Sequence, residues 1–355
     1  MSAPRLRPAV RAAIAVVAVV TLVASAAACS GSGTDEAAPT GPAGRGTAGP
    51  ATTVAASAHA SGPSVGCHAG AATPAGTTDM TLPSGGQDRR YRLEVPSGYD
   101  GTRPFALVFG LHSLTVDYRI VPAMSGFTDM ATRYDFIGVS PSGLVSTAPY
   151  WNAAPVADNG DLAFLTDLLD HLEATLCIDT GRVFSIGMSN GAQMSSLLAC
   201  RIPDRITAIA PIAGVELNQP CDGGPVPVIA FHGVADPIVP YEGGGMSSVQ
   251  IADANLYKGS IPQGTATPTG VDESMRRWAE HNGCDPAFVE TRVSPEVRKR
   301  TWSGCRAATE IYLVDGGGHA WPGKPQPAFE ASFGHGTTDI DATALSFAFF
   351  FDGRT

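Results

Sequence analysis

A serine between two glycines, Ser189 in "FSIGMSNGAQM", has the residue types and spacing of a nucleophile. In this G-x-S-x-G pattern the glycines leave room for a sharp turn that exposes the hydroxyl. The pattern alone is weak, because the chain has 41 glycines in 355 residues and a second match, "GPSVG" around Ser64. A serine hydroxyl also needs a base, and the base needs a third group to orient it.

Two residues that come later in the chain than Ser189 fit these roles, one as the base and one as the group that orients it. Asp236 in "FHGVADP" follows an apolar run directly, whereas other downstream aspartates do not. His319 in "GGGHAWPG" follows the last apolar run and lies in a glycine-rich turn, and His335 is the alternative. We therefore predict Ser189, Asp236 and His319 as a catalytic triad, in which the histidine takes the serine proton and the carboxylate orients the histidine.

The elements that must position these residues alternate along the chain. Continuous or alternating apolar runs predict strands, and apolar residues at helical spacing predict helices. The predicted strands are Arg89–Pro96, Phe105–His112, Phe136–Gly143, Arg182–Ser189, Ile206–Gly214, Val226–Gly233 and Thr309–Gly316. The predicted helices are Leu162–Leu176, Ala192–Ile202, Asp272–Gly283 and Ala342–Phe351. This alternation predicts an α/β fold with a mostly parallel central sheet and helices on both faces.

Ser189 lies where a buried strand gives way to a helix, which is the context of a nucleophile elbow. The helix N-terminus then points free N–H groups at the site where negative charge develops. The alternative is a serine that only caps the helix. Ser64 has no strand before it and no helix after it, so we predict that it lies in a linker. The order Ser, Asp, His along the chain is typical of the α/β-hydrolase fold.

An oxyanion hole needs two N–H donors aimed at the tetrahedral oxygen. Asn190, directly after the nucleophile, is the first candidate, and the loop "GLHSLT" after an early strand supplies the second. We predict the backbone of Leu114, or else Ser113, as that donor, with His112 supporting the turn. This chemistry requires no metal and no cofactor, and we predict none.

The N-terminal residues predict export. A basic head followed by an uncharged, mostly apolar run indicates a signal peptide over residues 1–28, and the run is short for a membrane span of about 20 residues. Cys29 after small residues resembles a lipobox, which predicts lipidation at Cys29, with ordinary secretion as the alternative. Residues 29–66 are rich in Gly, Pro, Ala, Ser and Thr and predict a disordered tether. Residues 67–355 then form a single catalytic domain of an extracellular protein, anchored at the cell surface if Cys29 is lipidated.

Six cysteines follow Cys29, and an even number in an exported chain predicts three disulfides. Several pairings are possible. Short separations favour two local bridges and leave a third pair by elimination: Cys284–Cys305, Cys200–Cys221 and Cys67–Cys177. No C-x-x-C motif or Cys/His cluster indicates a metal site. The formal charge of −10, without a basic stripe, argues against a nucleic-acid partner, and we expect a monomer whose membrane contact would be a lipid anchor.

With these residues placed, the chain resembles the secreted α/β-hydrolase esterases that include feruloyl esterases and polyhydroxybutyrate depolymerases. The resemblance covers about residues 67–355 and rests on ordered blocks: "LHSLT", "YWN", "DNGDLAFLTDLLDHL", "CIDTGRVFSIGMSNG", "PVPVIAFHGVADPIVPY", "WAEHNGC" and "GGGHAWPG". Ser113 departs from the family pattern, which usually has Gly there. The resemblance implies the same triad, and it implies that Trp151 and Asn152 line the active-site rim, with packing of Trp151 under a loop as the alternative.

The resemblance implies a serine carboxylesterase that hydrolyses an extracellular ester through an acyl-enzyme. A feruloyl (hydroxycinnamoyl) or acetyl ester of plant cell-wall polysaccharide is the first expectation, and polyhydroxybutyrate or its oligomers are the alternative. A non-catalytic hydrolase-fold surface lipoprotein is disfavoured because no triad member is lost, and a serine protease is disfavoured by the resemblance. Residues Tyr241–Val271 interrupt the α/β pattern, and we predict that they shape the acyl pocket rather than form a plain surface loop.

Overall fold

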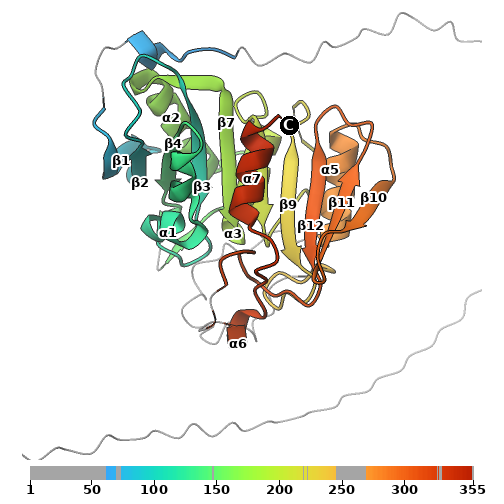
Figure 1. Cartoon of the computed structure of the whole chain (residues 1–355). Helices are drawn as coiled ribbons and strands as arrows, with labels where there is room; N and C mark the ends of the chain where they lie inside the picture. Colours follow the sequence, from blue (N-terminus) through green and yellow to red (C-terminus); the bar gives the residue numbers. More distant parts are fainter. Residues whose placement is uncertain are drawn as a thin grey trace, which may run out of the picture. The chain divides into compact units, whose positions relative to one another are not determined.

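A ten-stranded sheet runs through the folded unit of the computed structural model, in the order β1-β2-β4-β3-β7-β8-β9-β12-β11-β10 (Figure 1). The structure describes residues 61–68, 73–145, 148–218, 220–221, 223–244, 269–325, 327 and 330–353. The six central strands pair in parallel: β4 (Phe136–Pro141), β3 (Phe105–Leu111), β7 (Ile178–Met188), β8 (Ala208–Ile212), β9 (Val228–Gly233) and β12 (Thr309–Val314). The predicted, mostly parallel sheet is confirmed.

Antiparallel strands flank this parallel centre. They are β1 (Gly76–Ser84) and β2 (Gln87–Val95) on one side and β10 (Phe288–Arg292) and β11 (Val297–Trp302) on the other. A separate two-stranded ribbon joins β5 (Leu144–Val145) to β6 (Pro149–Tyr150). The sequence predicted β2 but missed β1, β10 and β11, because none of these three strands carries a long apolar run and β1 and β10 are largely exposed.

Helices cover both faces of the sheet. Alternate residues of β3 enter two separate apolar clusters, as a strand buried on both faces requires. One cluster takes side chains from α2 (Gly160–Thr175), α3 (Asn190–Arg201) and α5 (Val271–His281), and the other from α1 (Val121–Ser125) and α7 (Ala342–Phe351). Figure 1 shows α7 crossing in front of the central strands. Other helical segments within the described ranges are Val65–His68, Tyr118–Ile120, Phe127–Thr132 and α6 (Glu330–Phe333).

The folded unit begins before the boundary predicted at residue 66. Ser64 is 5% exposed, its Oγ donates to the Leu176 carbonyl at 2.6 Å, and it accepts the Ile178 N–H at 2.9 Å. A side chain at Gly66 would meet the Leu176 carbonyl oxygen at 2.3 Å, so glycine permits this close approach. The assignment of Ser64 to a tether was therefore wrong. A Gly/Pro-rich composition indicates only a weak local preference for helix or strand. It does not reveal that contacts with residues far along the chain hold the segment in place.

Three disulfides close the folded unit, and they are the three pairs expected from the sequence. Cys67–Cys177 ties the entry segment to the residue before β7, while Cys200–Cys221 and Cys284–Cys305 each join residues 21 positions apart. Closing loops in this way restricts the unfolded chain and stabilises the fold. Disulfides persist in oxidising compartments, so the three pairs are consistent with an exported protein.

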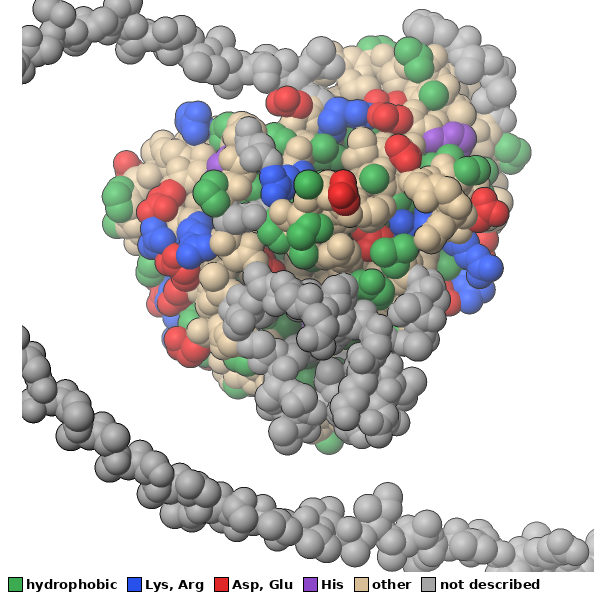
Figure 2. Space-filling model, turned by 180° about the vertical axis from the view of Figure 1, so that it is seen from behind, with side chains coloured by type: hydrophobic (Ala, Val, Ile, Leu, Met, Phe, Trp, Pro, Cys, Tyr) green, Lys and Arg blue, Asp and Glu red, His purple; other side chains and the backbone are tan. Residues whose placement is uncertain are grey.

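Acidic and basic side chains are interspersed on the described part of the face in Figure 2, which has no continuous basic area. The described ranges contain no helix that is both long and apolar enough to cross a membrane.

Candidate active site

The junction between β7 and α3 holds Ser189 in a strained backbone conformation. Its φ of 56° and ψ of −121° lie in a region that residues other than glycine rarely occupy. The Ser189 N–H donates to the Ile212 carbonyl on the neighbouring strand at 2.8 Å, which holds the turn against β8. The side chain makes no capping hydrogen bond to α3. The hydroxyl is therefore not used as a helix cap, contrary to the alternative interpretation.

The two glycines of the motif allow this turn because backbone approaches them closely. A Cβ on Gly187 would lie 2.4 Å from the Gly191 carbonyl oxygen. A Cβ on Gly191 would lie 2.3 Å from the Leu111 carbonyl oxygen at the end of β3. Larger residues at either position would push α3 away from the sheet. The spacing in the sequence thus reflects a steric requirement of the turn.

Asp236 and His319 form a buried hydrogen-bonded pair. His319 Nδ1 lies 2.8 Å from Asp236 Oδ2. The other carboxylate oxygen of Asp236 accepts the N–H groups of Ile238 at 2.8 Å and Val239 at 2.9 Å, which fixes the carboxylate plane. The exposed fractions of Ser189, Asp236 and His319 are 7%, 5% and 7%. These contacts leave His319 Nε2 free of the carboxylate.

All three predicted triad residues follow the carboxyl ends of parallel strands. Ser189 follows β7, Asp236 follows β9 and His319 follows β12, and β8 lies between β7 and β9. Neighbouring strands are about 5 Å apart, so loops of a few residues can bring these side chains together. Among the described residues, no hydrogen bond joins Ser189 to His319. In free enzymes this contact is often longer and tightens when substrate binds.

The alternative residues are engaged elsewhere. His335 is exposed and lies 3.1 Å from both Glu296 Oε2 and Glu330 Oε1, and these carboxylates raise its pKa. Asp272 accepts from Arg300 at 2.6 Å on the molecule's surface. Neither residue contacts Asp236 or His319 through a hydrogen bond in the described chain.

The two predicted oxyanion donors lie on segments that touch. Asn190 is the first residue of α3, so its backbone N–H has no intrahelical acceptor. Leu114 lies in the turn after β3. The Ser113 hydroxyl, at the position that departs from the family pattern, donates to the Met188 carbonyl at 3.2 Å and so joins this turn to the end of β7.

The structure corrects the expectation that the Trp151 side chain lines the rim. Trp151 is 2% exposed and its indole donates to the His112 carbonyl at 3.0 Å. Asn152 is partly buried, and its N–H donates to Asp161 at 2.7 Å while its side-chain oxygen accepts from Ala154 at 3.2 Å. Trp151 therefore packs beneath a loop, whereas Asn152 stays a predicted rim residue. The sequence could not distinguish the two roles because both favour a tryptophan.

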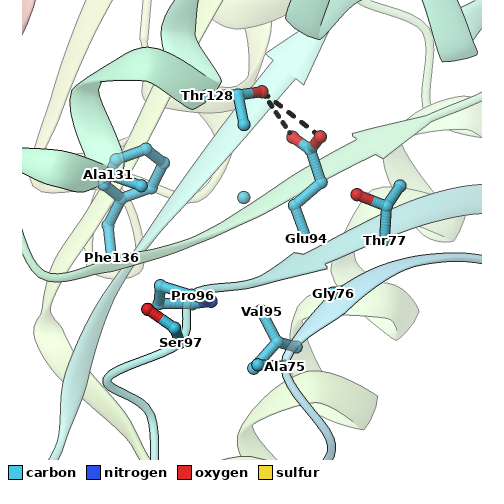
Figure 3. A pocket seen from close by; sticks show the side chains of 11 residues that line it. Ala75, Gly76, Thr77, Glu94, Val95, Pro96, Ser97, Thr128, Ala131 and Phe136 are labelled. Carbon is cyan, nitrogen blue, oxygen red and sulfur yellow. Dashed lines mark hydrogen bonds between the residues drawn. The ribbon is translucent and has the colours of Figure 1, made fainter.

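Two predictions lie outside the described residues. They are lipidation of Cys29 and a pocket-shaping role for most of the segment Tyr241–Val271, whose residues 245–268 are not described. A cavity of about 420 Å³ lies on another part of the sheet, beside β2 and β4, and is lined by residues such as Glu94, Thr128 and Phe136 (Figure 3). None of the predicted site residues lines it. No group of three or more His, Cys, Asp or Glu side chains within the described ranges could hold a metal ion.

One aromatic residue beside the pair was missed from the sequence. Phe333 at the end of α6 is 37% exposed, and its ring centroid lies 6.2 Å from that of His319. The Phe333 carbonyl accepts the N–H of His319 at 2.5 Å, so the two residues are held side by side. The sequence held one indication of its place near the site: Phe333 lies two residues before His335, the alternative candidate for the base.

The fold and the strained serine turn place this chain in the α/β-hydrolase class. Among solved structures, an acetyl xylan esterase from Aspergillus awamori matches with a TM-score of 0.51 at 16% identity, over 69% of this chain and 94% of that chain. At this identity the match establishes the fold. No protein-family model matches the chain.

Curated relatives identify the family. A protein of Nocardia uniformis subsp. tsuyamanensis named as an esterase, NocK, is 30% identical over 275 residues, 71% of this chain and 76% of the relative. Feruloyl esterase D of Neurospora crassa is 29% identical over 278 residues, 73% of this chain and 83% of the relative. The chain belongs to this family of α/β-hydrolase esterases, and the protein is a carboxylic ester hydrolase.

Proposed function

We propose that this protein is a feruloyl (hydroxycinnamoyl) or acetyl esterase that acts on plant cell-wall polysaccharide through an acyl-enzyme on Ser189. The observation that carries the mechanism is the buried 2.8 Å contact between His319 and Asp236, on the sheet edge that also holds the strained Ser189. The ester class is supported by relatives named feruloyl esterase. An acetyl group is a smaller acyl group attached through the same bond.

In the proposed mechanism, Ser189 Oγ attacks the ester carbonyl carbon while His319 Nε2 accepts its proton. Asp236 holds the proton on Nδ1, which leaves Nε2 free as the base and stabilises the charged ring. The backbone N–H groups of Asn190 and Leu114 stabilise the tetrahedral oxyanion. His319 then gives the proton to the departing alcohol, which leaves the acyl group on Ser189. His319 next deprotonates a water that attacks this acyl group. It then returns the proton to Ser189 Oγ as the bond between Oγ and the acyl carbon breaks, and the free acid departs.

The aromatic ring of Phe333 supports an aromatic acyl or alcohol group in the substrate. It is partly exposed beside His319, within the distance over which aromatic rings interact. A hydroxycinnamoyl ring placed there would bury apolar surface next to the reacting carbonyl. A short aliphatic chain would bury less.

A hydrolysis panel tests this proposal. We would compare methyl ferulate, p-nitrophenyl acetate, p-nitrophenyl butyrate and a hydroxybutyrate oligomer on the wild type and on Ser189→Ala. We expect methyl ferulate to have the highest kcat/KM and the Ser189→Ala variant to be inactive on every ester. A preference for the hydroxybutyrate oligomer would instead identify a polyhydroxybutyrate depolymerase. Unchanged hydrolysis by Ser189→Ala would overturn the triad.

We also propose that residues 1–28 are removed on export, that Cys29 carries lipid, and that one monomeric catalytic domain follows the tether. The three disulfides support an oxidising destination. The mass of the mature N-terminal peptide distinguishes a lipidated Cys29 from a free cleavage product. Light scattering on the purified protein measures its oligomeric state.

A further inference from the structure

The side chain of the first residue of α3 is hydrogen-bonded to a neighbouring loop. The Trp151 N–H donates to Asn190 Oδ1 at 2.6 Å, and Asn190 Nδ2 donates to the Trp151 carbonyl at 3.0 Å. This reciprocal pair fixes the Asn190 side chain in one orientation. Because Asn190 is also the residue whose backbone N–H would face the oxyanion, its side-chain contacts fix the direction of that N–H.

The same tryptophan also holds the segment after β3. The Trp151 indole donates to the His112 carbonyl at 3.0 Å and lies over the His112 ring, with centroids 4.9 Å apart. His112 Nε2 accepts the Gly143 N–H at 2.9 Å, so the ring proton is on Nδ1, which lies 2.8 Å from the Ser113 carbonyl. Burial lowers the pKa of His112 to about 4, so this arrangement is neutral and constant above that pH. The turn that carries Leu114 is thereby fixed.

The loop that carries Trp151 has its own buried anchor. Asp161 accepts the Asn152 N–H at 2.7 Å and pairs with Arg89 at 2.5 Å, and both charged side chains are almost fully buried. Removing one member of such a pair leaves an unpaired charge buried away from water, which is strongly destabilising. The pair therefore holds its geometry. Trp151 thus connects this buried ion pair to the start of α3 and to the segment that follows β3.

We propose that Trp151 is a positioning residue for the oxyanion hole, which aligns the donor on Asn190 through its backbone and the donor on Leu114 through its indole contact with His112. The inference rests on the proposed function, because the donors matter only if Ser189 is the nucleophile. It assigns the buried tryptophan a role in the transition state without contact to the substrate. Donors that are already aligned need no reorganisation when the oxyanion forms.

The test compares two buried tryptophans. Trp151→Phe and Trp278→Phe each remove one indole N–H that donates to a backbone carbonyl, His112 in the first case and Glu216 at 3.3 Å in the second. We expect similar decreases in Tm for both variants. We expect only Trp151→Phe to lower kcat by about tenfold or more with little change in KM, since loss of one complete oxyanion donor costs about 10²–10³. A boronic acid inhibitor should bind Trp151→Phe more weakly by a similar factor.

Asn190→Ala provides a second variant if Trp151→Phe does not fold. It keeps the backbone N–H but removes both hydrogen bonds to Trp151, so it should lower kcat in the same way. If whichever of these variants folds has the wild-type kcat while Ser189→Ala is inactive, the positioning role is overturned and the proposed function stays intact. Full activity of Ser189→Ala would overturn the proposed function itself.

Discussion

The carboxyl edge of the parallel strands and the β10–β11 hairpin both carry ionisable side chains, but the two regions hold them differently. At the carboxyl edge, Asp236 accepts three hydrogen bonds and is almost completely buried. On the hairpin, Glu290 pairs with Arg298 at 2.9 Å and with Arg300 at 2.7 Å, and about a third of its side chain is exposed. Water and salt screen the second kind of contact, which therefore contributes little. The hydrogen bonds of the buried Asp236 are shielded from water, so they hold its carboxylate in one orientation.

The largest expected difference is between two isosteric substitutions, one in each region. Asp236→Asn should lower kcat by about 10⁴, because the amide favours the wrong histidine tautomer while the fold is kept. Glu290→Gln should leave kcat unchanged and alter the free energy of unfolding by less than about 1 kcal/mol. Steady-state kinetics and urea unfolding measure both. Equal kinetic losses would mean that the comparison has misidentified the functional region.

The pH dependence of stability should also differ in sign between the regions. Burial raises the pKa of Glu216, in the loop after β8, to about 7. Between about pH 4.5 and 7 the unfolded chain loses this proton while the native protein keeps it, so native stability falls as pH rises through this window. The pKa of Glu290 is instead lowered by Arg300 and Arg298, so its contribution is lost as pH falls.

Glu216→Gln should remove the Glu216 effect. Relative to the wild type, the variant should gain up to about 3 kcal/mol of unfolding free energy between pH 4.5 and pH 8. Urea denaturation at a series of pH values measures the difference. Parallel stability curves for the two proteins would contradict a raised pKa for the half-buried Glu216.

A smaller difference is expected between two exposed aromatic rings. Phe333→Ala should raise KM for methyl ferulate about three- to tenfold, because ring contacts contribute about 0.5–1.5 kcal/mol. It should leave KM for a hydroxybutyrate oligomer, which has no aromatic ring, unaffected. Phe288→Ala, on the hairpin at 42% exposure, is the matched control and should change neither KM. A similar KM for methyl ferulate in all three proteins would remove Phe333 from the substrate site.

Sequence reasoning worked where burial imposes a pattern and missed features that depend on distant contacts. Strands β7, β9 and β12 were predictable because a strand covered on both faces must be apolar over most of its length. The residues that follow them were then candidates by position alone. The hairpin strands were not predictable, because their cross-strand ion pairs leave no apolar period. The role of Trp151 depends on partners 39 positions away on either side, which no local pattern encodes.

The measurement that tests the central claim most directly is covalent trapping of the nucleophile. The purified wild type would be treated with a stoichiometric fluorophosphonate, assayed for ester hydrolysis, and digested for peptide mass mapping, with Ser189→Ala alongside. We predict one adduct, on Ser189, that forms in proportion to the loss of activity and is absent from the variant. Loss of activity with the adduct on another residue, or full activity with Ser189 modified, would contradict the account.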